Sequence, residues 1–219
     1  MIKKILFTRP CHDLETEYLH CFSEKLIKEI KSIGEYNPIN LEDGDATRKN
    51  FEKAMRKSNP RLVVLNGHGT KNSIFGHDDE VIADGDNIDL FNSKIIYAAV
   101  CDSLDGIGLD ATTRGGADAF IGYESEFMII VDLAHTSTPK KDKNSKPFKE
   151  VYVKLIIALL SGLSVEESIE MTKKLMRKLI REYGTYGIRD KYGDAPLIRM
   201  ALFWDLYFLN VHGNLNTVF

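Results

Sequence analysis

Two apolar runs, each followed at once by a reactive side chain, constrain the fold of this chain most strongly. Residues 61–65 (RLVVL) lead into Asn66, Gly67 and His68, and residues 94–100 (KIIYAAV) lead into Cys101. Short runs rich in Val and Ile are typical of strands buried on both faces of a parallel sheet. Provided that the two strands are neighbours, His68 and Cys101 emerge together at the carboxyl edge, where open α/β folds form their sites.

Strand and helix patterns alternate along the rest of the chain. Further strands are expected over residues 3–8 and 117–122, a short one over 127–131, and a hairpin near 80–83. Helices are expected over residues 14–33, 46–57 and 107–113, from Pro147 to about residue 160, and after Ser164. Gly34 is the expected end of the first helix, Asp45 the expected cap of the second, and Ser164 begins a capping box. The apolar tail, 200–211, is expected to be a late core element, and the lysine-rich stretch 136–146 a polar surface loop. This alternation predicts one α/β domain over residues 1–219, a mostly parallel sheet with helices on both faces.

Composition narrows the class of protein. The chain has 219 residues, 43% of them hydrophobic, and a formal net charge of -3, so there is no overall basic footprint for nucleic acid. No apolar stretch is long enough to span a membrane, and the N-terminal run is too short for a signal peptide. Three cysteines without a secretion signal argue against a disulfide framework. We therefore expect a cytoplasmic protein that binds neither a membrane nor nucleic acid.

An imidazole beside a thiol predicts nucleophilic catalysis. Cys101 supplies the nucleophile, with a pKa expected to fall beside an imidazolium or the following helix, and His68 supplies the proton-transfer group. The glycines beside His68 let a substrate backbone approach closely, and the amides of Gly69 and Cys101 are the expected oxyanion donors. The competing interpretation is a buried filler cysteine and an ordinary loop histidine.

Three ordered motifs resemble those of the caspase-like (clan CD) cysteine peptidases, especially the CHAT and gingipain-like branch. They are VVLNGHG at 63–69, AAVCDS at 98–103 and GGADAFIG at 115–122, followed by GLSVEES at 162–168 and an aromatic end near 203–204. The chain departs from many of these relatives at Asp102, which follows the cysteine where they carry a small residue and glycine. The resemblance implies a caspase-like three-layer α/β/α sandwich.

The same resemblance implies a Cys–His dyad that cleaves a protein or peptide substrate after one chosen residue. Its selecting side chains lie in the loops after the first strand and after the strand that follows the cysteine. Glu124 and then Asp13 are the expected pocket acids, which would favour a basic residue, whereas Arg9 in that place would favour an acidic one. The relatives also suggest activation by a protein partner in a bacterial or archaeal defence or signalling system.

Metal and cofactor chemistry is not expected from the residue spacing. A zinc set from Cys11, His12, His20 and Cys21 lacks a second pair at the usual spacing, and the acids from Asp78 to Asp89 do not fit an EF-hand loop. His77, His135 and His212 receive no role. Two other classes stay open: a non-catalytic caspase-like binding module, and a flavodoxin- or receiver-like domain. The latter is disfavoured because a receiver needs acids at the end of its first strand, where this chain has Thr8, Arg9 and Pro10.

Overall fold

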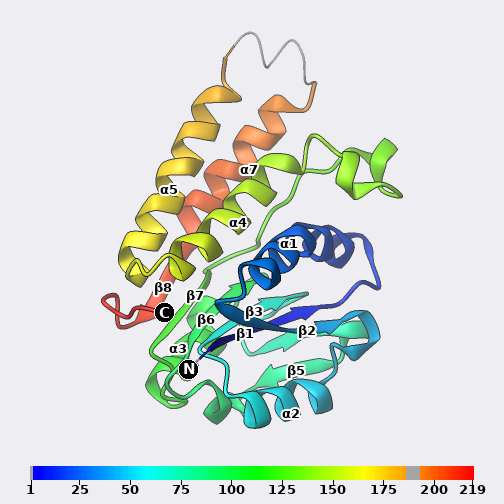
Figure 1. Ribbon diagram of the computed structural model, residues 1–219. Helices are drawn as coiled ribbons and strands as arrows, with labels where there is room; N and C mark the ends of the chain where they lie inside the picture. Colours follow the sequence, from blue (N-terminus) through cyan, green and yellow to red (C-terminus); the bar gives the residue numbers. More distant parts are fainter. Residues whose placement is uncertain (1, 186–192) are drawn as a thin grey trace.

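A computed structural model of the chain, described for residues 2–185 and 193–219, is a three-layer α/β/α sandwich (Figure 1). The main sheet of the described residues has six strands in the order β2-β1-β3-β6-β7-β8, all parallel except β8. These strands are β1 (Lys3–Arg9), β2 (Tyr36–Glu42), β3 (Leu62–Asn66), β6 (Ile95–Ala99), β7 (Ala119–Tyr123) and β8 (Leu209–Gly213). A small antiparallel hairpin lies apart from this sheet and comprises β4 (Ser73–Phe75) and β5 (Val81–Asp84).

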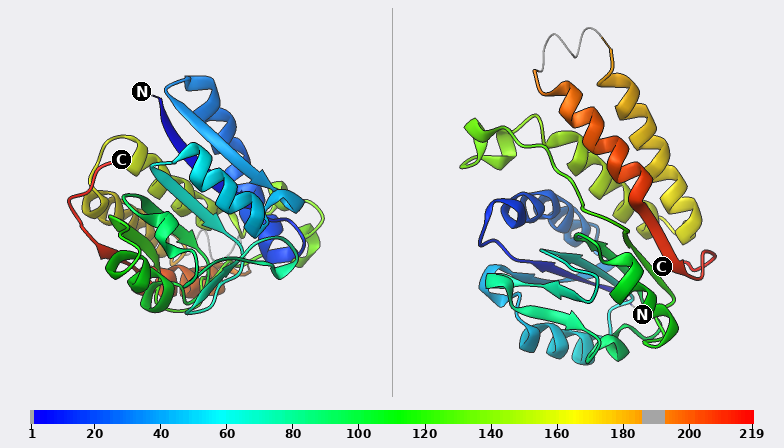
Figure 2. Two further views of the ribbon diagram at one scale, coloured as in Figure 1. Left: turned by 90° about the horizontal axis from the view of Figure 1, so that it is seen from below. Right: turned by 180° about the vertical axis from the view of Figure 1, so that it is seen from behind.

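Helices cover both faces of the sheet, as the strand–helix alternation predicts (Figure 2). The helices are α1 (Leu14–Ile33), α2 (Arg48–Ser58), α3 (Leu109–Thr113), α4 (Lys146–Leu160), α5 (Val165–Glu182) and α7 (Ala195–Phe208). One face packs against α1, α4, α5 and α7, and the other against α2, α3 and the hairpin. α5 and α7 lie side by side and extend beyond the sheet (Figure 1).

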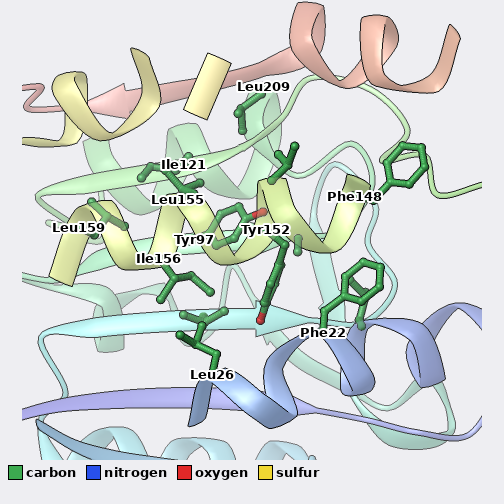
Figure 3. Packing of buried hydrophobic residues seen from close by; sticks show 14 of the residues in the cluster. Phe22, Leu26, Tyr97, Ile121, Phe148, Tyr152, Leu155, Ile156, Leu159 and Leu209 are labelled. Carbon is green, nitrogen blue, oxygen red and sulfur yellow. The ribbon is translucent and has the colours of Figure 1, made fainter. Parts of the chain in front are cut away.

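The core on the α1 side is built from aromatic side chains. Figure 3 shows Phe22 of α1 and Tyr97 of β6 on either side of Tyr152 of α4, with ring centroids 6.1 and 5.7 Å from that of Tyr152. All three side chains are buried. Offset and tilted contacts of this kind add to the stabilisation from burying apolar area. They hold α1 and α4 firmly over the strands that carry the candidate site.

Most predicted elements are confirmed, with specific helix ends. Gly34 ends α1 in the left-handed region at φ 77°, where a residue without Cβ is favoured. Ser164 caps α5, and a reciprocal bond from Glu167 completes the predicted capping box. The predicted cap of α2, Asp45, was wrong. The side chain of Thr47 is the cap and accepts a hydrogen bond from the backbone N–H of Asn50.

One strand was not predicted and one predicted strand was wrong, each for a physical reason. Strand β2 was missed because its sequence, YNPINLE, has Pro38 and two asparagines, residues that strands disfavour. Pro38 is tolerated there because β2 is an edge strand of the sheet. Conversely, residues 127–131 look like a strand but form an irregular segment that packs against the α1-side core.

The apolar tail and the lysine-rich stretch also differ from expectation. The tail forms α7 and β8, but one face of α7 stays open, with Met200 54% and Phe203 61% exposed. In the lysine-rich stretch Asp142 is buried, and its carboxylate accepts the Tyr18 hydroxyl at 2.7 Å and the Asp132 N–H at 3.0 Å. The stretch is therefore anchored to α1 rather than being only a solvated loop.

Among the described residues, no helix combines the length and the apolar character that crossing a membrane requires.

Candidate functional site

The sheet register brings the two predicted residues to one place. β3 and β6 are hydrogen-bonded neighbours, and Asn66 pairs with Ala99 at the end of their ladder. His68 and Cys101 each follow two residues after that last pair. Because the strands are parallel, both side chains leave the sheet at its carboxyl edge, as the apolar runs predicted.

His68 and Cys101 line the same cavity, of about 270 Å³. Its other walls come from α1, the ends of β3 and β6, and the irregular segment 127–131. These remaining lining residues are Leu14, Glu15, Tyr18, Leu19, Gly67, Val100, Phe127, Met128, Ile129, Ile130 and Val131. Most of the described lining residues are apolar, and Glu15 and His68 are the two among them with an acidic or a basic side chain. The cavity therefore suits a side chain with a long apolar portion.

The His68 ring is oriented by Asp13. The ring nitrogen Nε2 lies 2.5 Å from the Asp13 carboxylate, a charge-assisted hydrogen bond between the β1–α1 connection and the β3 loop. Burial raises the pKa of Asp13, but the bonds from His68 and Thr16 outweigh it and bring the pKa to about 2. Asp13 is thus an anion that holds the ring by Nε2, and this bond leaves Nδ1 unused.

The Cys101 thiol is half-buried at the cavity wall. The backbone N–H of Phe127 points at its sulfur, at 3.4 Å. Burial raises the pKa of Cys101 above its ordinary value, and the Phe127 N–H only partly opposes this. The expectation of a lowered thiol pKa was therefore wrong, since desolvation disfavours the thiolate more than its neighbours favour it.

The two site loops lie in direct contact at Gly69. A Cβ added there would meet the Cys101 carbonyl oxygen at 2.6 Å and Val100 Cγ2 at 2.7 Å, so only glycine fits. The hairpin bonds on either side run from Phe75 N–H to the His68 carbonyl (3.0 Å) and from Thr70 N–H to the Ser73 carbonyl (2.9 Å). Gly69 thus occupies a non-hydrogen-bonded pair, and the ladder does not use its N–H.

Asp102, directly after the candidate nucleophile, has an unusual backbone conformation. Its φ is 52°, in the left-handed region that non-glycine residues seldom occupy, although Asp tolerates it better than most. Its N–H donates to the Ser125 carbonyl at 3.0 Å, which holds the chain reversal after β6. This turn holds Cys101 beside the cavity.

The predicted pocket residues lie elsewhere. Asp13 is committed to His68 and to the first turn of α1, and Glu124 accepts a hydrogen bond from the Asn210 amide at 2.8 Å. Neither lines the cavity. Arg9 is 2% exposed and bonds Glu42, Ser23 and the His20 carbonyl, so it belongs to the interior beneath α1.

Sequence reasoning missed two components of the site. Glu15, an exposed residue on the first turn of α1, is the one acidic residue among the described residues that line the cavity. The segment 127–131, expected to be a strand, forms the opposite wall, and buried Asp205 of α7 accepts the Met128 N–H at 3.0 Å. The signal for Asp13 was available: an Asp cap directly after the strand that neighbours β3 must lie at the same sheet edge.

A second cavity, about 450 Å³, lies between α1, α4 and residues 139–146. It is larger, but neither His68 nor Cys101 lines it. Its lysines belong mainly to the lysine-rich stretch, and Lys140 pairs with Glu24 of α1. The larger volume therefore does not identify the candidate site, because His68 and Cys101 line the smaller cavity at the sheet edge.

Comparison with models of known protein families gives no match for this chain, and comparison with curated proteins gives none either.

Proposed function

We propose that this protein is a cysteine endopeptidase that uses Cys101 and His68 as a dyad, as its resemblance to the caspase-like peptidases implies. The observation that carries the proposal is the shared cavity: both side chains line it, and the Gly69 loop rests on the Cys101 backbone. A buried filler cysteine and an ordinary loop histidine would not be expected to line one cavity, to follow the same paired positions of β3 and β6, and to include a ring that a carboxylate holds.

The raised thiol pKa favours a general-base route over a preformed thiolate. His68 Nδ1 takes the Cys101 proton as the sulfur attacks the substrate carbonyl, while Asp13 stabilises the imidazolium at Nε2. The N–H groups of Gly69 and Cys101 donate to the oxyanion. His68 then gives the proton to the leaving amine, and water, deprotonated by the same ring, hydrolyses the thioester to release the acid product and the free thiol.

We propose that the residue before the scissile bond is Lys or Arg, and that Glu15, rather than Glu124 or Asp13, is the acid that selects it. The cavity offers apolar walls for an aliphatic stem and this carboxylate for the cationic end. Activation by a protein partner is retained from the resemblance. The Phe127 N–H on the Cys101 sulfur is a contact that an arriving substrate must displace.

The test is cleavage of a peptide library by the purified protein and by Cys101→Ala, His68→Ala and Glu15→Gln. We expect the first two variants to abolish cleavage and the third to shift the preference from basic to apolar residues. Cys21→Ala and His135→Ala are matched controls, since His135 also pairs with a carboxylate, Asp132, at 3.0 Å, but outside the cavity. Loss of cleavage in the controls as well would contradict the proposal.

The second candidate is a non-catalytic module that holds a peptide in the same cavity. The raised pKa of Cys101 favours it, because burial disfavours the reactive thiolate. Thiol labelling separates the two candidates. Faster alkylation of Cys101 than of Cys11 and Cys21, lost in His68→Ala, supports the peptidase, whereas slow and equal labelling of all three supports the module.

A further inference from the structure

Two histidines that have no part in the dyad lie together at the same sheet edge. His12 lies in the connection between β1 and α1, and His77 begins the short turn between β4 and β5. Their ring centroids are 5.3 Å apart at an interplanar angle of 75°. The two segments are distant in the sequence, so only the tertiary fold brings these imidazoles together.

The ring nitrogens of this pair lack hydrogen bonds. Both nitrogens of His12 and Nδ1 of His77 are buried from solvent without a hydrogen-bond partner among the described residues. The His12 side chain is only 11% exposed. Buried polar atoms are normally satisfied, because leaving one without a partner is unfavourable. A metal ion binds one nitrogen of each ring, and the unpartnered nitrogens of His12 leave this residue free to supply one.

The geometry points to a divalent transition-metal site, and we propose that His12, His77 and Asp78 bind Zn²⁺. One ligand atom from each of these residues lies within 4.8 Å of the others. His77 Nε2 and Asp78 Oδ1 are 3.6 Å apart, too far for a hydrogen bond. Tetrahedral zinc with bonds of about 2.0–2.2 Å holds its ligands roughly 3.4 Å apart, so small side-chain movements complete the set.

The charges around the pair also favour a cation. Asp79 lies 3.5 Å from His12, Asp13 lies 3.6 Å from it, and Asp43 lies 3.3 Å from His77. Two imidazoles with carboxylates suit zinc, whereas calcium requires six to eight oxygen ligands, which this set does not offer. The fourth zinc position belongs to water.

A competing triad shares His12. His12, Asp13 and His68 also place ligand atoms within 4.8 Å of one another. There, however, the Asp13 oxygen already bonds His68 at 2.5 Å, so an ion would have to break the pair that orients the dyad. In the proposed set the ring nitrogens of His12 have no such bond to lose. Zinc at His12 therefore braces the connection that carries Asp13 and leaves the dyad intact.

The experiment is calorimetric titration of the chelator-treated protein with Zn²⁺, with thermal melting in parallel. We expect one ion per chain and a higher melting temperature in its presence. His77→Ala, His12→Ala and Asp78→Asn should each weaken binding at least about tenfold, which corresponds to about 1.4 kcal/mol. His135→Ala is the matched control and should bind as the wild type does.

Two results would overturn the site. Equal zinc affinity in His77→Ala and the wild type, with native circular dichroism in both, removes His77 as a ligand; His77→Gln repeats the comparison if the alanine variant is unfolded. Loss of zinc binding in His68→Ala with retention in His77→Ala moves the ion to the competing triad. Because the readouts are binding and melting, they stand whether or not the dyad cleaves peptides.

Discussion

The contact between the two site loops makes Gly69→Ala the sharpest perturbation of this structure. The new Cβ would meet the Cys101 carbonyl oxygen at 2.6 Å, whereas ordinary van der Waals contact begins at 3.4 Å. The loops must therefore separate by about 0.8 Å, and neither neighbour can yield easily, because one is backbone and the other is Val100 at the end of a buried strand.

The magnitude follows from that displacement. Overpacking a rigid site costs about 1–3 kcal/mol in the free energy of unfolding. At about 2–4 °C per kcal/mol for a chain of this size, the melting temperature should fall by roughly 2–12 °C. Separating nucleophile from base by close to an ångström should lower the rate of any dyad reaction about a hundredfold.

The assay compares Gly69→Ala with Gly44→Ala, where an added Cβ meets nothing within 4 Å. Urea unfolding gives stability, and alkylation of Cys101 together with peptide cleavage gives reactivity. Gly44→Ala should be neutral or slightly stabilising, by about 0.4–1 kcal/mol. Equal stability and equal Cys101 reactivity in the two variants would refute the contact between the loops and the argument built on it.

Three further predictions follow from buried groups and from a helix cap. Burial raises the pKa of Asp205 well above its ordinary value, so the free energy of unfolding should fall as the pH rises above the unfolded pKa of about 4. Asp205→Asn should therefore be more stable than the wild type at pH 7 but not at pH 3. A gain in stability that does not depend on pH in urea titrations would contradict this. The alkylation rate of Cys101 in His68→Ala should still be rising at pH 9, because burial raises the thiol pKa above 9.0; a plateau below pH 8 would show otherwise. Ser164→Ala should cost about 1 kcal/mol of unfolding free energy through loss of the α5 cap, while Ser32→Ala, on the exposed last turn of α1, should cost less.

The sequence was sufficient where local pattern decides structure. The runs before His68 and Cys101 are apolar on both sides of the chain, which only a strand buried on both faces satisfies. Gly34 and the Ser164 capping box mark helix ends through backbone conformation and hydrogen bonds that lie within a few residues. Parallel connection then places both reactive residues at one edge, so the candidate site could be found without coordinates.

Segments whose conformation depends on distant partners could not be predicted in this way. Strand β2 has a sequence that disfavours strands but pairs along β1, and residues 127–131 have a strand-like sequence but pack as an irregular wall. In both cases tertiary context overrides propensity. The lysine-rich stretch is polar in sequence, yet Asp142 is buried because Tyr18 lies beside it.

What the sequence determined by itself is the alternation of the core strands with helices and the two side chains that follow β3 and β6, because hydrophobic periodicity and capping act over a few residues. Only the tertiary structure decided that Asp13 holds His68 across 55 positions, that Glu15 faces the cavity, and that His12 meets His77. It also decided that the pKa of Cys101 is raised, since the pKa of a thiol depends on how deeply the folded chain removes it from water.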